Sequence, residues 1–280
     1  MQMSLLNSRI INEVRDFDDF DLISKIAHQN WGLKLDQSKS SSILPRVEKR
    51  KQALGITSLR EYCVRVSQDS EEAQSFINAL TTNVTHFYRE AHHFEDFEQR
   101  VLGPRSGQIA SGSRFRVWSA GCSSGQEPYS IAGSIMAVIP NAAATDVKIL
   151  ATDIDTNVLQ AAALAKYHPS ECSFPSEDLR LRLFPESDGD FVIPKGIREL
   201  VAFRHLNLVK SWPFQGPFDA IFCRNVSIYF DRETQEKLWI AFSSVMRDGA
   251  TLYIGHSERI NAPERFGLRS DGITTYRKLD

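Results

Sequence analysis

One segment, VWSAGCSSGQEPYS at residues 117–130, limits the fold of this chain more than any other. It predicts a buried strand over 115–119, a glycine-bounded loop over 121–125 and a helix that begins at Pro128. A glycine-rich loop between a strand and a helix is where α/β folds bind nucleotide-like cofactors. A second apolar strand follows about thirty residues later and ends in Asp153. Together these features predict half of a nucleoside-binding sheet.

Strand and helix patterns alternate from residue 114 onwards. The strands are predicted over 115–120, 147–152, 218–223 and 250–255, and the helices over 128–138, 155–166 and 232–247. This alternation predicts an α/β fold with a doubly wound, mostly parallel, Rossmann-like sheet. The stretch at about 168–205 interrupts the alternation with prolines, glycines and short apolar runs. It predicts a small antiparallel β subdomain inserted in the sheet domain.

The first 105 residues have helical patterns instead. The segment SLRE at 58–61 is a capping box ahead of an apolar face, Ser70 is a second candidate cap, and Gly55 is a candidate helix stop. The segment GPRSGQIASGS at 103–113 predicts a linker. We therefore expect a helical N-terminal domain with its linker over 1–105, and the sheet domain over 106–280.

Composition argues against several other functions. The net charge of −2 gives no general attraction to nucleic acid or membranes. No apolar run approaches the ~20 residues of a membrane span, and the first residues lack the pattern of a secretory signal. The four cysteines are scattered and form no CxxC pair, so we expect a cytoplasmic protein with reduced thiols. We expect His92 and His93 to be a surface pair and no metal to bind, because neighbours on a helix point apart.

The loop also restricts the cofactor. It lacks the middle glycine of a dinucleotide-binding loop and the lysine of a P-loop, so it suits a nucleoside without phosphates. S-adenosylmethionine is such a nucleoside, and Gln126 and Glu127 are candidate acceptors for its ammonium and sulfonium groups. Asp153 stands at a strand end, where a carboxylate can accept from both ribose hydroxyls. The alternative for Asp153 is to cap the helix that follows.

Four further segments make the prediction specific. They are TTNVTHFYRE at 81–90, ATDID at 151–155, LNL at 206–208 and FDAIFCRNVSIYFD at 218–231. In this order, with the glycine loop between them, they closely resemble the CheR family of chemotaxis receptor methyltransferases. The resemblance implies transfer of a methyl group from S-adenosylmethionine to glutamate side chains on the cytoplasmic helices of bacterial chemoreceptors, with S-adenosylhomocysteine as the product. It also implies a helical domain, a sheet domain with a β insertion, and a cofactor between the two domains. We expect a monomer.

The resemblance implies cofactor contacts from both domains. They are Asn83, Thr85 and Arg89 from the helical side, and Asp153, Asn207, Leu208, Asn225 and Val226 from the sheet domain. Some family members have an acidic residue at the position of Gln126, while Glu127 is retained here. The ammonium contact is therefore open between these two side chains.

The chemistry sets the expected roles of Arg89 and Tyr229. A glutamate carboxylate is already ionised at neutral pH, so its methylation needs no general base, only in-line alignment of oxygen, methyl carbon and sulfur. A guanidinium stabilises a full carboxylate at least as well as the partly neutralised transition state. We therefore expect Arg89 to hold and aim a carboxylate, either of the substrate or of the cofactor. We expect Tyr229 to help orient the acceptor; the alternative is a core aromatic.

Partner surfaces and other function classes complete the prediction. Arg46, Lys49, Arg50 and Lys51 form a basic cluster, either a solvated helix face or, by the resemblance, a docking face for acidic receptor helices. Some family members capture a receptor's C-terminal peptide on the β insertion by strand addition, and the sequence leaves that open here.

Two other functions are disfavoured. The retained site residues argue against a non-catalytic sensing or scaffolding module, and the missing glycine argues against a nicotinamide-dependent oxidoreductase.

Overall fold

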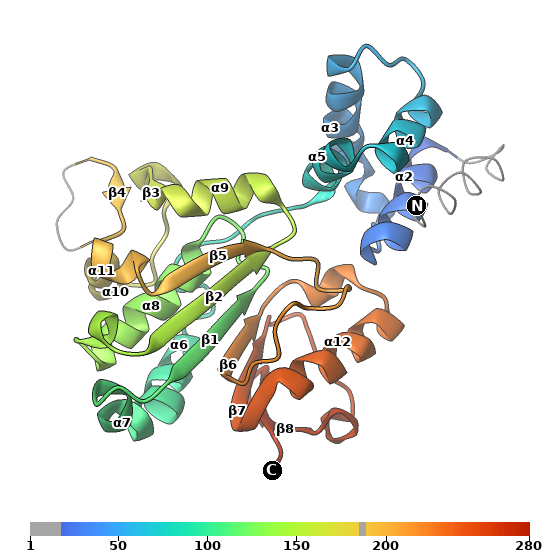
Figure 1. Cartoon of the computed structure of the whole chain (residues 1–280). Helices are drawn as coiled ribbons and strands as arrows, with labels where there is room; N and C mark the ends of the chain where they lie inside the picture. Colours follow the sequence, from blue (N-terminus) through green and yellow to red (C-terminus); the bar gives the residue numbers. More distant parts are fainter. Residues whose placement is uncertain (1–17, 185–188) are drawn as a thin grey trace.

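The computed structural model describes residues 18–184 and 189–280, which form a helical domain beside a sheet domain (Figure 1). Residues 1–17, for which we predicted no secretory signal, lie outside the described residues. No helix in the described ranges is both long and apolar enough to span a membrane.

The helical domain is built from helices whose ends follow their capping residues. They are α2 (Asp19–Trp31), the short 3-10 helix η1 (Gln37–Lys39), α3 (Ser40–Ala53), α4 (Leu59–Gln68) and α5 (Ser70–Leu80). Ser58 caps α4 as predicted, because its side chain accepts from the N–H of Glu61 at 3.4 Å. Gly55, with φ at 68°, follows the end of α3. The cap of α5 is Asp69, not the predicted Ser70, which is the first residue of the helix; a carboxylate is the stronger acceptor for the free N–H groups.

The sheet domain contains a seven-stranded sheet in the order β5-β2-β1-β6-β7-β9-β8. The strands are β1 (Phe115–Ala120), β2 (Val147–Asp153), β5 (Val201–His205), β6 (Phe218–Cys223), β7 (Met246–Ile254), β8 (Leu268–Gly272) and β9 (Thr275–Lys278). The first five strands of this order pair in parallel, and β9 pairs antiparallel with β7 and β8. The predicted doubly wound, mostly parallel sheet is confirmed, with an unpredicted antiparallel edge.

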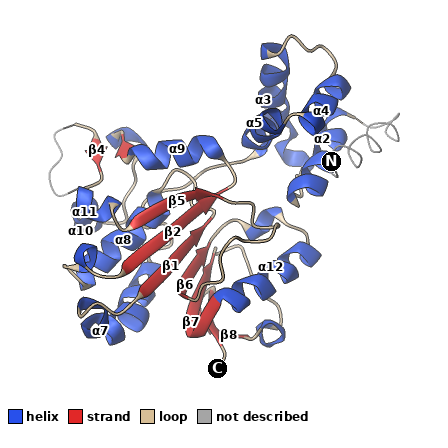
Figure 2. Ribbon diagram, in the orientation of Figure 1, coloured by secondary structure: helices blue, strands red, loops and turns tan. Residues whose placement is uncertain are grey.

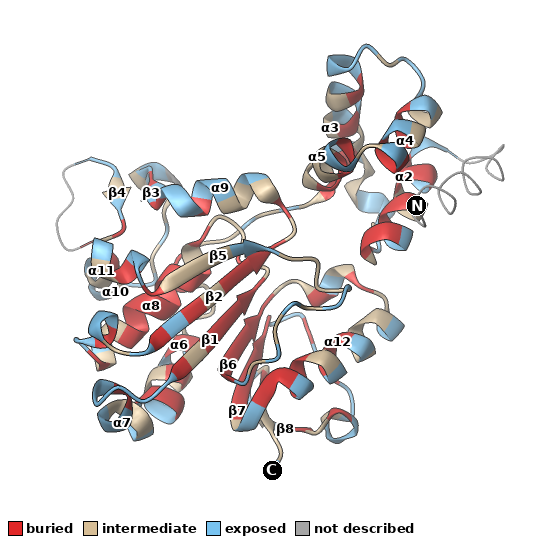
Figure 3. Ribbon diagram, in the orientation of Figure 1, coloured by how far each residue is buried: buried red, intermediate tan, exposed pale blue. Residues whose placement is uncertain are grey.

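Helices cover both faces of this sheet (Figures 1 and 3). They are α6 (His92–Asp96), the π-helix η2 (Phe97–Leu102), η3 (Gly103–Arg105), α7 (Ser106–Ala110), α8 (Gln126–Val138), α9 (Thr156–Leu164) and α12 (Arg232–Val245), with the short η4 (Ala142–Ala144), η6 (Ser227–Tyr229) and η7 (Pro263–Phe266). Neighbouring strand residues point to opposite faces, so Val117 and Trp118 belong to different cores. The core around Trp118 continues into α12 and the helical domain, so the two domains share buried apolar contacts.

The helices from His92 to Ala110 precede the sheet in the chain but pack on it. The rings of Phe94 and Phe97 lie 5.8 and 5.5 Å from the ring of Phe222 on β6. Residues 92–105, which we grouped with the helical domain, therefore lie on the sheet. The segment at 103–113, which we predicted as a linker, contains η3 and α7.

The insertion is a small antiparallel unit, as predicted, but mostly helical (Figure 2). It contains β3 (Lys166–Tyr167) and β4 (Phe191–Val192), which pair antiparallel, with η5 (Pro169–Glu171), α10 (Glu177–Leu183) and α11 (Lys195–Arg198). The apolar run at 200–203, which we placed in the insertion, begins β5 instead. This run pairs in parallel with β2, where Phe203 lies opposite Ala151, because an apolar strand beside β2 extends the main sheet.

Candidate cofactor and active site

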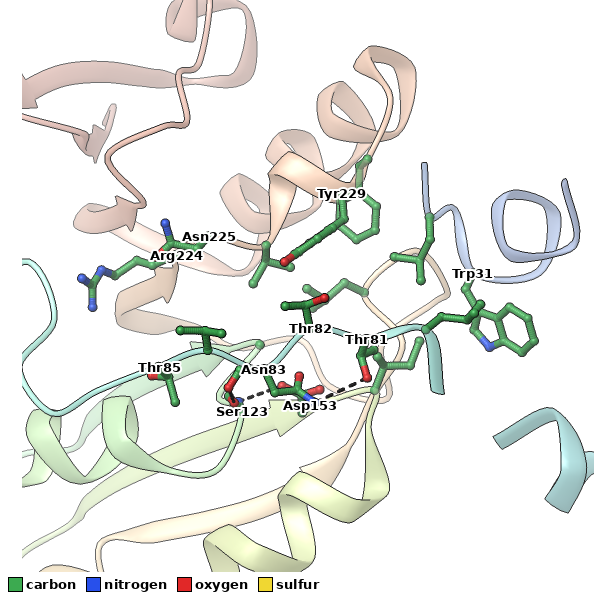
Figure 4. A pocket seen from close by; sticks show the side chains of 18 of the residues that line it. Trp31, Thr81, Thr82, Asn83, Thr85, Ser123, Asp153, Arg224, Asn225 and Tyr229 are labelled. Carbon is green, nitrogen blue, oxygen red and sulfur yellow. Dashed lines mark hydrogen bonds between the residues drawn. The ribbon is translucent and has the colours of Figure 1, made fainter. Parts of the chain in front are cut away.

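A pocket lies where the carboxyl ends of the parallel strands face the helical domain. The sheet domain contributes the loop after β1, the end of β2 and residues from 206–208 and 224–230, and the remaining lining comes from 31–35 and 80–89. In Figure 4, Tyr229 faces this space from one side, and Asn83 and Asp153 from the other. Open parallel sheets bind their ligands at this edge.

Two glycines shape the loop between β1 and α8. Gly125 has φ at 97°, and a Cβ there would lie 2.8 Å from the Tyr167 hydroxyl and 2.9 Å from Cβ of Ala162. Gly121 has φ at 87°, and a Cβ there would overlap the side chain of Val226. Only glycine combines this backbone with so close an approach. The glycines therefore press the loop against the segments that border the pocket.

Asp153 ends β2 and is buried at the pocket wall. One carboxylate oxygen accepts from the N–H of Ser123 at 2.8 Å and the other from the N–H of Asp155 at 3.0 Å. Burial raises the pKa of Asp153, while these hydrogen bonds oppose the shift. The helix cap that we considered for Asp153 is supplied by Asp155, so Asp153 has no capping role. A carboxylate has about four acceptor sites, so Asp153 retains capacity toward the pocket.

The two neighbours Gln126 and Glu127 differ in their surroundings. Glu127 is buried at the pocket wall and accepts from Ser119 Oγ at 2.7 Å and from Arg224 Nη1 at 3.1 Å. Burial raises the pKa of Glu127, and the charge of Arg224 opposes this shift. Gln126 accepts from Ser124 Oγ at 2.8 Å and is not part of the pocket wall. Of the two side chains, Glu127 is thus the one that lines the pocket.

Arg224 is a buried cation that the sequence analysis missed. Its side chain is 2% exposed and lies between Glu127 and Glu90, 3.1 and 3.3 Å away. It also donates to the backbone carbonyl of Arg89. The residues on either side of Arg89, Tyr88 and Glu90, both have positive φ, at 51° and 56°. Arg224 thus holds a strained turn that presents Arg89 to the pocket.

The turn after β6 is organised by another missed residue, Glu258. Its carboxylate accepts from the N–H groups of Asn225 at 2.8 Å, Val226 at 3.0 Å, Ser227 at 2.6 Å, Ile228 at 3.3 Å and Gly255, and from the hydroxyl of Ser227 at 2.7 Å. Asn225 has positive φ, at 59°, a conformation that asparagine tolerates better than most residues. Both predicted contacts, Asn225 and Val226, reach the pocket wall from this turn.

Asn83 and Thr85 line the pocket from the segment that follows α5. The amide of Asn83 donates to Asp155 at 2.7 Å, and the hydroxyl of Thr81 donates to the same oxygen at 2.7 Å. Asp155 also caps α9, so one buried carboxylate joins the end of the helical domain to the sheet domain. Figure 4 shows Thr81 and Asn83 beside Asp153. The ATDID segment contained Asp155, but the sequence gave no sign of its partners.

The remaining predicted residues also line the pocket. They are Arg89, Asn207, Leu208 and Tyr229. Asn207 accepts from the N–H of Val209 at 3.0 Å, which fixes its amide. Burial raises the pKa of Tyr229, and the nearby charge of Arg89 lowers it by less. Arg89 and Tyr229 are thus close enough to interact electrostatically, and Arg89 donates to the Val84 carbonyl at 3.0 Å.

The basic cluster of α3 is largely engaged within the domain. Arg46 donates to the Thr81 carbonyl at 2.7 Å, and Arg50 forms a forked pair with Glu72. The ammonium of Lys51 is turned inward and donates to the Thr57 carbonyl at 2.9 Å. Lys49 is exposed. These four residues therefore do not form one open basic face, so a docking role would fall mainly on Lys49 and the exposed part of Arg50.

The prediction of a surface histidine pair is wrong for His93. His93 is fully buried, its ring lies 4.2 Å from that of His92, and it bonds to the Thr274 hydroxyl at 2.9 Å. Tertiary packing against Tyr253 of β7 and against the turn before β9 outweighs the separation expected for neighbours on a helix. Glu90, His92 and His93 bring ligand-type atoms within 4.8 Å of one another. Arg224 lies 3.3 Å from Glu90, and its charge opposes a metal ion there.

The donors and walls of the pocket fit S-adenosylmethionine. Two buried carboxylates, Asp153 and Glu127, stand at separate points of the wall, suited to ribose hydroxyls and to an ammonium group. Apolar side chains such as Ile154, Leu206 and Leu208 lie in the same wall and suit an adenine ring. These features define an S-adenosylmethionine-dependent methyltransferase.

Comparison with known proteins supports this class and identifies the family. The family described as "CheR methyltransferase, all-alpha domain" matches residues 18–81, and "CheR methyltransferase, SAM binding domain" matches 83–273. The chain belongs to the CheR methyltransferase family, and it is a methyltransferase of chemotaxis that uses S-adenosylmethionine.

Three relatives illustrate the similarity. The chain is 42% identical to the "Probable chemotaxis protein methyltransferase" of Rhizobium etli, over 89% of this chain and 96% of that protein. It is 38% identical to the "Chemotaxis protein methyltransferase" of Escherichia coli, over 92% and 89%. It is 35% identical to "Chemotaxis protein methyltransferase 2" of Pseudomonas aeruginosa, over 92% of each.

Proposed function

We propose that this protein methylates glutamate side chains on the cytoplasmic signalling helices of bacterial chemoreceptors and forms glutamate methyl esters. The names of the relatives support a role in chemotaxis. The observation that carries the proposal is Arg89, a guanidinium in the pocket wall with no carboxylate within 4 Å among residues 18–184 and 189–280. A cation placed in this way suits an incoming carboxylate.

The residues of the chain have separate tasks in this reaction. S-adenosylmethionine, when bound, supplies a methyl group on a positively charged sulfur. Asp153 would hold its ribose and Glu127 its ammonium, while Arg89 would orient the acceptor carboxylate. A tyrosine hydroxyl is protonated at neutral pH, and burial raises the pKa of Tyr229 further, so this hydroxyl can donate to that carboxylate. No residue needs to remove a proton, because the acceptor glutamate is already ionised.

The wall formed by the helical domain also limits access of water. Charge is neutralised as a carboxylate attacks a sulfonium, and water stabilises the separated charges more than the transition state. Trp31 and Leu33 from the helical domain cover the apolar side of the pocket. Closure by these side chains therefore favours transfer as well as binding.

Methyl transfer to receptor fragments tests the proposal directly. Tritiated S-adenosylmethionine and a panel of receptor cytoplasmic fragments should give base-labile label on glutamate. Fragments with glutamate-to-alanine changes at the labelled positions are the control. Tight binding of S-adenosylhomocysteine without transfer to any fragment would contradict the proposal and favour the non-catalytic sensing module.

Substitutions of Arg89 and Tyr229 test their roles. For Arg89→Ala we expect kcat/KM for the receptor to fall roughly 100-fold, because acceptor alignment is lost. For Tyr229→Phe we expect a fall of roughly tenfold, because one hydrogen bond is lost. Calorimetry with S-adenosylhomocysteine shows which carboxylate Arg89 holds: an unchanged Kd points to the acceptor. Unchanged kcat/KM in both variants would exclude the assigned roles.

A further inference from the structure

A second cation, Lys39, reaches Tyr229 from the helical domain. Its ammonium lies 4.2 Å from the centroid of the Tyr229 ring, within the range of a cation–π contact. The backbone brings the two segments together, since the N–H of Lys34 donates to the Tyr229 carbonyl at 2.7 Å and Leu33 forms a β-bridge with Phe230. The Lys39–Tyr229 contact is therefore held by two backbone links in addition to the side chains.

Lys39 and Arg89 share an unusual property. Neither has a carboxylate within 4 Å among the described residues, although both are close to Tyr229. Lys39 is only partly exposed, and burial lowers its pKa while the charge of Asp36 acts in the opposite direction. Many other basic groups of the domain, such as Arg50 and Lys51, do have such partners. Two cations beside one pocket tyrosine thus have no carboxylate within 4 Å among the described residues, although a buried charge is normally paired at close range.

We propose that Lys39 is a positioning residue that fixes the Tyr229 ring and, together with Arg89, recognises acidic side chains of the acceptor helix. This inference rests on the proposed function, because it assumes a protein carboxylate as the acceptor. The contact with the ring places Tyr229, whereas the remaining ammonium hydrogens are available to a carboxylate next to the reacting one. A helix carries such neighbours three or four residues apart.

The contact of Lys39 with a neighbouring carboxylate of the acceptor determines which kinetic constant it changes. An ammonium that binds an unreacted neighbouring carboxylate interacts equally with the ground state and the transition state, so it lowers KM more than it raises kcat. Its attraction acts through charge, so salt weakens it. A purely structural lysine would instead change stability, cofactor affinity and kcat without a specific effect on the receptor KM.

Three variants separate these possibilities: Lys39→Met, Lys39→Arg, and Lys34→Met as the matched control. Lys34 is an exposed lysine of the same segment. For Lys39→Met we expect KM for a receptor cytoplasmic fragment to rise roughly tenfold, with kcat lowered less than about threefold. We expect an unchanged Kd for S-adenosylhomocysteine and a weaker dependence of KM on salt. Lys39→Arg should restore most of the affinity, and Lys34→Met should behave as the wild type.

Several results would overturn the inference. They are an unchanged KM in Lys39→Met, an equal effect of Lys34→Met, or no rescue by Lys39→Arg when thermal unfolding shows that this variant is folded. Failure of the proposed function looks different, since wild-type protein would then transfer no methyl group to any receptor fragment. Normal wild-type transfer with a wild-type KM in Lys39→Met would reject only the role of Lys39.

Discussion

The two walls of the pocket are held in place by different kinds of contact. On the sheet side, Asp153 and Glu127 are buried and receive hydrogen bonds from backbone N–H groups, a hydroxyl and the guanidinium of Arg224. On the helical side, residues 74–83 meet the sheet domain through side-chain donors, as in the hydrogen bonds of Gln74 to the Ile154 carbonyl at 2.8 Å and of Asn78 to Thr156 at 3.0 Å, while residues 33–34 add two backbone links to 229–230. The first wall is part of the sheet framework, whereas the second is attached to it.

The two kinds of contact should control two different properties of the enzyme, namely cofactor affinity and alignment of the acceptor. Groups fixed by buried backbone bonds keep their geometry without a ligand, so the sheet wall should determine cofactor affinity. A wall attached through polar side chains can be loosened without unfolding the sheet, so it should determine how the acceptor is aligned. Substitutions in the two walls should therefore affect different measurements.

The largest effect is expected for Glu258→Ala in the sheet wall. The change leaves five backbone N–H groups around Asn225 without their acceptor, so the free energy of unfolding should fall by about 3–5 kcal/mol. Urea unfolding measures it. The control is Glu264→Ala, an exposed glutamate of the neighbouring helix, with an expected change within about 0.5 kcal/mol. A loss of less than about 1 kcal/mol in Glu258→Ala would contradict the view that the sheet wall keeps its geometry without a ligand.

Asp153→Asn should affect the cofactor more than the fold. An amide keeps one acceptor oxygen but loses the charge, so the Kd for S-adenosylhomocysteine should rise roughly 30-fold, or about 2 kcal/mol. Calorimetry measures the Kd, and thermal unfolding should show a smaller change than for Glu258→Ala. A Kd within twofold of the wild type would contradict the assignment of Asp153 to the ribose.

Asp155→Ala should loosen the attached wall. It removes the cap of α9 and the bonds from Thr81 and Asn83, so stability should fall by about 1–2 kcal/mol. Receptor methylation should fall by a larger factor than cofactor affinity. Ser176→Ala, which removes the cap of α10 in the insertion, is the matched control and should leave methylation unchanged. If Asp155→Ala lowers cofactor affinity as much as methylation, the two walls are not separable.

The smallest effect concerns an exposed link between the domains, His28 to Asp231 at 2.6 Å. The hydrogen bond from His28 lowers the pKa of Asp231 to about 2. Because the folded pKa is below the unfolded value of about 3.9, the stabilisation is present above pH 4 and is lost as the pH falls toward 2. His28→Ala should cost less than about 1 kcal/mol at pH 6, and the difference from wild type should shrink between pH 4 and 2. A difference that grows in this range would contradict the assignment.

Local sequence patterns predicted most parallel strands of the sheet but not its antiparallel edge or the strand that begins near residue 201. The runs at 115–120, 147–152 and 218–223 are mostly apolar and mostly buried because helices cover both sides, so the sequence identified them as strands. The strand β8 has mostly exposed residues and alternates weakly, which hid the antiparallel edge. The run at 200–203 was short enough to suit either the insertion or the main sheet. Its parallel partner β2 lies about fifty residues earlier in the chain.

The same limit applies to the site. The predicted contact Asp153 stands at a strand end, a position that the sequence pattern reveals. Arg224 and Glu258 act on residues 97 and 33 positions away, so only the folded chain shows what they hold. Gln126 looked equivalent to Glu127 in the sequence, because a helix start does not reveal which of two neighbouring side chains turns inward. The sequence therefore predicted the site residues that local patterns mark, and it missed those whose role depends on partners far away in the chain.

The turn after β6 has the arrangement of an anion-binding site that the protein occupies with its own side chain. Converging backbone N–H groups at such a turn are the usual cradle for a phosphate or another bound anion. Here the protein fills that cradle with its own carboxylate, Glu258, which is covalently attached and cannot diffuse away. A phosphate would have to displace it and would then meet an unpaired negative charge. The N–H groups of this turn are therefore already satisfied by a side chain of the protein itself.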